Sequence, residues 1–177
     1  VSVDNETAAF EATFRLLQLG HRRIAFLRFV LLSIHDIDPD SKRREYGFRS
    51  ALKEAGIPSP EDSVFNTFSK DTSQSPAIQA CLNTKPAFSA VFAVDSKGAR
   101  LVAQAANERG LSVPGDLSIA CFQSVNRYAG NSSGPQIDFE AIGNESVRLL
   151  GSQARYPTHL QMPTKWFDGE TIAPPKR

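Results

Sequence analysis

The chain has 177 residues, which is enough for one ordinary domain or two small lobes. Its formal net charge of +1 gives it no overall field that would attract nucleic acid or an acidic membrane. Two scattered cysteines do not make a disulfide framework, and no apolar run is long enough to span a bilayer. We therefore expect a globular protein from the reducing cytoplasm, without a membrane partner.

The first half of the chain alternates helical spacing with apolar runs. In order, the pattern predicts a helix up to Gly20, a strand at 24–27 that can reach 32, a polar loop at 33–40, a helix from Ser41 to Gly56, a strand at 64–68 and a helix at 75–83. Ser41 is the predicted cap of the second helix. Residues 1–5 resemble the end of a buried strand, so we expect a fragment of a longer polypeptide.

The middle of the chain carries the clearest pattern. Residues 90–94 form an unbroken apolar run, as in a strand that is buried on both faces. Asp95 and Ser96 stand where a helix should begin, and Gly110 stands where it should end. Residues 117–122 form a second apolar run. Strand, helix and strand with short links predict one right-handed βαβ unit.

The remainder is less regular. It is predicted to contain a polar segment at 123–136, a helix at 139–154, a strand at 160–167 and a tail at 171–177. The alternation along the whole chain predicts the α/β class, with a parallel sheet and helices on both of its faces.

Ligands of such sheets bind outside the carboxyl ends of the strands. The two central strands end at Asp95 and Gln123, so both side chains should emerge at one sheet edge, although they could instead be a helix cap and a turn residue. Arg44 is predicted in the first turn of its helix, where a cation opposes the helix dipole unless it meets an anionic or polyhydroxy ligand. A salt bridge to Asp36, Asp38 or Asp40 is the alternative. Phe68 ends its strand and could stack on a sugar or belong to the core.

Other motifs predict little chemistry. There is no dinucleotide fingerprint, no phosphate loop and no metal-ligand spacing, so we expect no cofactor and no metal. Residues 130–134 match the G-x-S-x-G elbow of serine hydrolases at Ser132, but Pro135 stands where a helix should follow. The turn at residues 20–24 could bind a phosphate, although the cations of such a turn more often face the carboxyl end of a helix.

Several blocks together resemble the lactose/galactose-repressor (LacI/GalR) family. They are Asp4-Asn5, Leu17-x-x-Gly20-His21-Arg22-Arg23-Ile24-Ala25-Phe26-Leu27, Arg44-x-x-Gly47-Phe48-x-x-Ala51-Leu52, Ala90-Val91-Phe92-Ala93, Gly110-Leu111-x-Val113-Pro114-x-Asp116-Leu117-Ser118-Ile119 and Ile142-Gly143. They occur in the family's order and spacing across nearly the whole chain.

The resemblance implies a periplasmic-binding-protein-like fold that binds a small effector, usually a sugar or a purine, and is not an enzyme. It implies that residues 1–137 are the C-terminal lobe, that 138–162 return to an absent N-terminal lobe, and that 163–177 are a terminal strand and tail. Operator DNA would be bound through a missing helix-turn-helix domain, in a homodimer. A periplasmic sugar-binding protein of a transport system is the alternative on the same fold.

The same resemblance assigns ligand contacts residue by residue. Arg44 matches the family's effector-binding arginine, Asp95 a position that faces the ligand, and Phe68 an aromatic position that can stack on it. Gln123 departs from the family, which commonly has a carboxylate there. A glutamine amide can still accept and donate hydrogen bonds to hydroxyl groups.

Overall fold

A computed structural model describes residues 1–31, 36–58, 61–68, 70–124, 131–151 and 159–176. Its main sheet has four parallel strands in the order β4 (Val64–Thr67), β2 (Ile24–Leu31), β5 (Ala90–Ala93) and β6 (Ser118–Cys121). A short strand β3 (Asp36–Ile37) pairs antiparallel with the end of β2. The predicted parallel α/β sheet is therefore confirmed.

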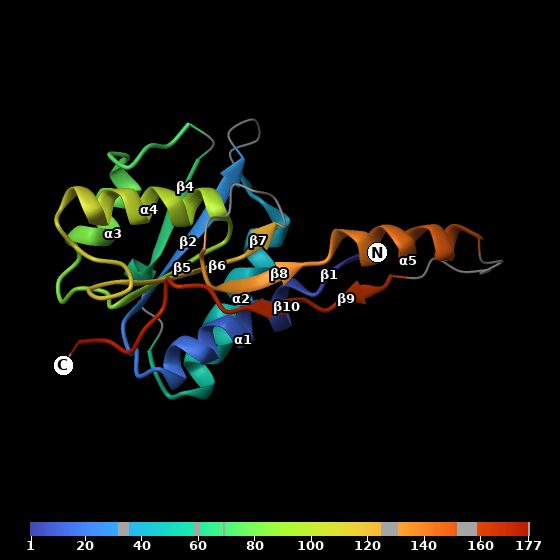
Figure 1. Cartoon of the computed structure of the whole chain (residues 1–177), viewed down its shortest axis with the longest axis horizontal. Coiled ribbons are helices and arrows are strands. Elements are labelled where there is room, and N and C mark those ends of the chain that lie inside the picture. Colours follow the sequence, from blue (N-terminus) through green and yellow to red (C-terminus); the bar gives the residue numbers. More distant parts are fainter. Residues whose placement is uncertain (32–35, 59–60, 69, 125–130, 152–158, 177) are drawn as a thin grey trace.

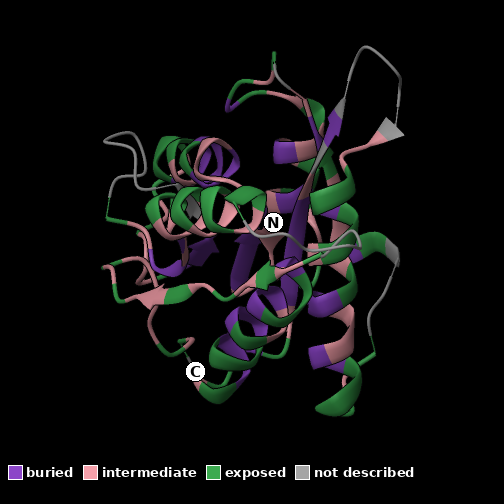
Figure 2. Ribbon diagram, turned by 90° about the vertical axis from the view of Figure 1, so that its right-hand side faces the viewer, coloured by how far each residue is buried: buried purple, intermediate pink, exposed green. Residues whose placement is uncertain are grey.

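Helices cover both faces of this sheet (Figure 1). Helices α1 (Asn5–Gln18) and α2 (Pro39–Glu54) pack on one face, and α3 (Pro76–Asn83) and α4 (Ser96–Glu108) pack on the other. Each face has its own apolar core, and the central strands β5 and β6 between them are buried along their whole length (Figure 2). Burying a large apolar side chain contributes about 1.5–3 kcal/mol, so these two cores supply most of the stability.

A ladder of phenylalanine rings forms the centre of the first core. Phe26 packs on Phe48 and Phe92, and Phe92 in turn stacks on Phe122, with ring centroids 5.0, 5.6 and 5.9 Å apart. Phe48 belongs to α2, Phe26 and Phe92 belong to strands, and Phe122 follows a strand. The ladder therefore joins the helix to the sheet. It leads to the carboxyl end of β6, where Phe122 follows the strand.

Glycine permits the close approach of α1 and α2. A Cβ atom at Gly47 would lie 2.2 Å from the backbone oxygen of Glu6 and 2.9 Å from the backbone nitrogen of Phe10. Both atoms belong to the backbone of α1, so neither can move aside without the helix. The two helices can keep this separation only if position 47 has no side chain.

The helix ends agree with the sequence except at the start of α2. Asp95 caps α4, and Gly56 and Gly110 follow their helices with positive φ, as predicted. The prediction that Ser41 caps α2 is wrong, because Asp38 is the cap and its Oδ2 accepts the Ser41 backbone N–H at 2.8 Å. Pro39 then opens the helix, where its fixed φ is already helical.

The polar segment predicted at 123–136 contains two strands. Strand β7 (Gln123–Ser124) pairs with β8 (Gly134–Ile137), and β8 pairs with β10 (Lys165–Phe167) in a three-stranded sheet. The single strand predicted at 160–167 is also wrong, because β9 (Gln161–Met162) pairs instead with β1 (Ser2–Val3) near the start of the chain. A short 3-10 helix (Glu61–Ser63) precedes β4.

Helix α5 (Phe139–Gly151) extends away from the rest of the molecule (Figure 1). None of its residues is buried, and Val147 and Leu150 are 71% and 87% exposed. Ile142, near the start of the helix, is partly buried and packs against the first core. The predicted end of this helix at Ala154 lies outside the described residues.

Residues 171–175 bind the amino-terminal edge of the main sheet. The Ser118 hydroxyl and the Thr171 hydroxyl bond to backbone groups across the two segments, and Ile119 N–H donates to the Thr171 carbonyl at 2.7 Å. His21 is 1% exposed, and its ring nitrogens lie 2.9 Å from the Ser89 hydroxyl and from the Ala173 carbonyl. Since a carbonyl only accepts, Nε2 carries the proton and Nδ1 accepts from Ser89.

We expect the stability of the protein to fall in mild acid because of His21. Burial lowers the pKa of His21 from its ordinary 6.5, so below pH 6.5 the unfolded chain takes up a proton that the native ring refuses. The contribution of the neutral His21 ring to the free energy of unfolding is therefore lost as the pH falls from about 7.5 towards about 5.5. Urea unfolding at the two pH values should show this loss, and a His21→Gln variant should show a smaller one. An equal loss in both proteins would assign the effect to other groups.

Candidate ligand-binding site

The register of the main sheet brings the predicted site residues to one edge. Phe29 pairs with Thr67, Leu27 with Ala93, and Ala93 with Cys121, and all these strands run in the same direction. Phe68, Asp95 and Gln123 follow one or two residues after the last paired positions of their strands. The backbone at each of these positions therefore lies at the carboxyl edge, as the sequence predicted.

Arg44 is held at this edge by three contacts. Its Nε donates to Asn5 Oδ1 at 2.7 Å, its Nη1 donates to the Val94 carbonyl at 2.5 Å, and its guanidinium lies 3.9 Å from the centroid of the Phe122 ring. The side chain thus joins α2 to the start of α1 and to the residue that follows β5. Arg44 belongs to the second turn of α2, not to the first as predicted, because the helix begins at Pro39.

The fixed guanidinium keeps donors available. Among the described residues no acceptor is recorded for Nη2 of Arg44, and Asp95 uses only Oδ1, which accepts the Gly98 backbone N–H at 2.7 Å. A planar donor edge and a free carboxylate oxygen at one edge of a sheet suit a ligand with neighbouring hydroxyl groups.

Burial and charge act on Arg44 in opposite directions. Desolvation lowers the pKa of Arg44, while Asp40, Asp38 and Asp95 raise it. The predicted alternative, a salt bridge from Arg44 to Asp38 or Asp40, is absent from the described part of the chain, where the acids act only through their nearby charge. The Asp36 side chain lies outside the described atoms. An arginine in this setting stays charged and retains donors for an added ligand.

Phe68 is linked to the same edge through its backbone. The Phe68 carbonyl lies 3.4 Å from Nζ of Lys97 in the first turn of α4, and the Phe68 N–H donates to Asp71 at 2.8 Å. The ring is half-buried, and none of the ring contacts recorded for the described residues joins it to Arg44 or Asp95. The Gln123 side chain lies outside the described atoms, although its backbone belongs to β7.

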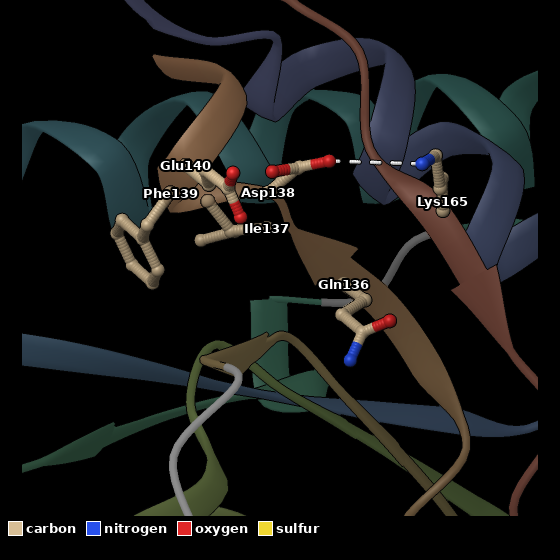
Figure 3. Close-up of a pocket in the computed structure, with 6 residues that line it drawn as sticks. All are labelled: Gln136, Ile137, Asp138, Phe139, Glu140 and Lys165. Atoms are coloured by element: carbon tan, nitrogen blue, oxygen red, sulfur yellow. Dashed lines mark ion pairs between the residues drawn. The ribbon is translucent and has the colours of Figure 1, made fainter. Parts of the chain in front are cut away.

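A hollow of about 360 Å³ lies beside β8, the strand that pairs with β7 (Figure 3). Gln136, which pairs with Gln123 in register, lines it together with residues at the start of α5, among them Phe139. Lys165 and Asp138 form an ion pair of 3.6 Å on its rim. Arg44, Phe68 and Asp95 do not line this hollow, so it adjoins the predicted site instead of containing it.

The structure also bears on the alternative chemistries. Ser132 is followed by strand β8, whereas a nucleophile elbow needs a helix at that point. No group of three or more metal-ligating side chains is present in the described residues. Within those same residues, none of the helices combines the length and the apolar character needed to cross a membrane.

Two residues of the site were not predicted as such. Asn5 supplies the oxygen that orients Arg44, and Phe122 supplies the ring beneath it. Both are buried, at 1% and 2% exposure. Asn5 was singled out only as part of the Asp4-Asn5 block of the family resemblance, and Phe122 could not be distinguished from an ordinary core residue at the end of an apolar strand.

Comparison with known proteins agrees with this fold. Residues 14–172 match the periplasmic binding protein-like domain family. The transcriptional regulator DegA of Bacillus subtilis is 36% identical over 127 residues, which cover 71% of this chain and 35% of that protein. Catabolite control protein A of Priestia megaterium is 30% identical over 177 residues, or 97% of this chain and 48% of that protein.

Solved structures give the same result. The transcriptional regulator CelR in complex with cellobiose has a TM-score of 0.77 and 25% identity, and the match covers 97% of this chain and 54% of that one. The chain spans less than half of the length of DegA and of catabolite control protein A. It belongs to the periplasmic binding protein-like domain family, and the relatives named above are transcriptional regulators.

Proposed function

We propose that this chain binds a small polyhydroxy effector, such as a sugar, for a transcriptional regulator of the LacI/GalR family. The observation that carries the proposal is the fixed guanidinium of Arg44. Its Nη2 and the second carboxylate oxygen of Asp95 lie at the same sheet edge, and neither has a hydrogen-bond partner among the residues that the structure describes. Paired donors and acceptors of this kind fit the hydroxyl groups of a sugar. The cellobiose bound to the similar regulator CelR supports this ligand class.

The rest of the regulator would act through the same domain. Effector binding would bias the closure of two lobes and so change DNA binding by a helix-turn-helix domain outside these residues. Such a regulator is a cytoplasmic homodimer and not an enzyme. The relatives named above are transcriptional regulators, which favours this function over a periplasmic transport protein.

The proposed division of the chain follows from α5. Residues 1–137 would form the C-terminal lobe, residues 138–162 would pack on a second lobe contributed by chain outside these residues, and 163–177 would return to the first. The exposure of Val147 and Leu150 supports this division, because apolar side chains on a helix are normally covered.

Isolated from the rest of the regulator, this chain should self-associate through α5. Exposed apolar patches drive oligomerisation, so replacing Val147 and Leu150 together with glutamine should shift the chain towards monomer. Sedimentation velocity over a range of concentrations measures this. Tyr46→Gln, which removes a 61%-exposed aromatic residue from α2, is the matched control and should have no effect. A strictly monomeric wild-type chain at high concentration would contradict the prediction.

Titration of sugars into the full-length regulator tests the proposed function. Calorimetry against a panel of mono- and disaccharides, cellobiose among them, should find one that binds. The Asp95→Asn variant should then weaken binding about tenfold, because an asparagine still caps α4 but lacks the carboxylate. Asp62→Asn, at an exposed position, is the control. If no sugar binds, or if both variants behave alike, the proposed site is wrong.

A further inference from the structure

A second hollow, of about 170 Å³, lies at the opposite edge of the main sheet. Arg22 and Arg23, which precede β2, line it on one side, and Phe88, which precedes β5, lines it on another. Leu52 and Ile57, from the end of α2 and just beyond it, complete its apolar wall. It is therefore separated from Arg44 and Asp95 by the length of the strands.

Both arginines are fixed in place by the protein. Arg22 Nη1 donates to the carbonyls of Leu17 and His21 at 2.9 and 3.0 Å. Arg23 Nε donates to the Pro86 carbonyl at 3.0 Å, and its guanidinium lies 5.2 Å from the centroid of the Phe88 ring. The expectation that these cations face the carboxyl end of α1 is thus met by Arg22. These bonds use only Nη1 of Arg22 and Nε of Arg23.

The remaining donors have no acceptor in the described part of the chain. No hydrogen bond is recorded there for Nε or Nη2 of Arg22, or for Nη1 or Nη2 of Arg23. Neither guanidinium lies in a salt bridge with a carboxylate of the described residues. Two adjacent cations therefore border one hollow, and within the described ranges no carboxylate pairs with them.

The hollow, its two arginines and the Phe88 ring together indicate a class of ligand. A guanidinium matches the two oxygens of a carboxylate or phosphate bidentately, and prior fixation of its side chain reduces the entropy lost on binding. The apolar side of the hollow, with the Phe88 ring, suits a flat hydrocarbon group attached to that anion. We propose that this hollow binds a small aromatic acid, either an aryl carboxylate or an aryl phosphate, independently of the effector site.

Titration of the full chain with phenyl phosphate and with benzoate tests the inference. Inorganic phosphate and benzyl alcohol carry the anion and the ring separately, so each should bind at least about tenfold more weakly than the better of the two acids. Comparison of phenyl phosphate with benzoate shows which anion is preferred. Nuclear magnetic resonance should place the shifted amides at Ile57 and Phe88 and leave those near Asp95 unchanged.

Variants give the second arm of the test. Arg22→Gln and Arg23→Gln should each weaken the preferred acid about tenfold. Arg100→Gln, which makes the same change at an exposed position on α4, should leave the affinity unchanged, and so should Arg44→Lys. Equal binding of inorganic phosphate, equal losses in Arg100→Gln, or amide shifts outside the hollow would each overturn the inference. Because the amide shifts are measured on the wild-type chain, the test holds even if a variant fails to fold.

Discussion

Gly47→Ala should lower the free energy of unfolding by about 3 kcal/mol and the melting temperature by about 6–12 °C. The added Cβ would meet the backbone oxygen of Glu6 at 2.2 Å, and the two helices would have to separate to accept it. Separation of α1 and α2 also weakens the packing of Phe48, which is fully buried beneath them. Thermal and urea unfolding of the purified variant measure the loss.

The matched control for Gly47→Ala is Gly143→Ala in α5. A Cβ at Gly143 meets no atom within 4 Å, so alanine there should stabilise the helix by about 0.5–1 kcal/mol. The same substitution is thus expected to act with opposite signs at two helical glycines. A Gly47→Ala protein that melts at the wild-type temperature would show that the helices can move apart freely.

Arg44→Lys should weaken effector binding by about ten- to a hundredfold in the full-length regulator. Lysine keeps the charge, but it cannot bond Asn5 and Val94 and also present a planar donor edge to a ligand. Calorimetric titration with the sugar that the panel identifies measures this loss of affinity. Arg43→Lys, at an exposed position on the same helix, is the control and should bind normally.

Arg44 should also contribute to the stability of the folded protein. Arg44→Ala leaves the buried Asn5 oxygen and the Val94 carbonyl without their donor and uncovers one face of the Phe122 ring. We expect a loss of about 2–4 kcal/mol on unfolding in urea. Unchanged effector affinity in Arg44→Lys, combined with this loss in Arg44→Ala, would make Arg44 a purely structural residue.

The main sheet was predictable because its sequence signals are local and agree with one another. Residues 90–93 form a strand buried on both faces, and such strands consist of uninterrupted apolar residues. Gly110 takes a φ of +72° that other residues avoid, so a glycine marks the end of α4. The carboxyl edge, and with it the placement of Asp95, follows from the parallel order of the strands.

Strand β8 was not predictable because nothing in its composition distinguishes it from a loop. It is formed by Gly134, Pro135, Gln136 and Ile137, and it lies against β6 so closely that a Cβ at Gly134 would be 1.8 Å from the Cys121 carbonyl. Ser133 just before it is fully buried, and its hydroxyl accepts from the Gly169 N–H at 3.1 Å. The hydrogen-bond partners of this segment lie far away in the sequence, so a local sequence pattern cannot reveal them.

The contacts of Arg44 were missed for a related reason. Asn5 lies 39 residues away, and only the folded packing of α1 on α2 brings its amide oxygen to the guanidinium. The misplaced start of α2 has a local cause, since Asp38 and Ser41 are both good caps and Pro39 decides between them. Sequence patterns thus located the arginine at the correct edge without the residues that orient it.

The bond between His21 and Ala173 joins residues that are 152 positions apart. During synthesis on the ribosome, the strands of the main sheet emerge as far as Cys121 before Ala173 does. Until then the ring nitrogen of His21 and the hydroxyl of Ser118 lack the partners that they have in the finished protein. The amino edge of a nascent sheet therefore stays open to water until residue 173 has emerged.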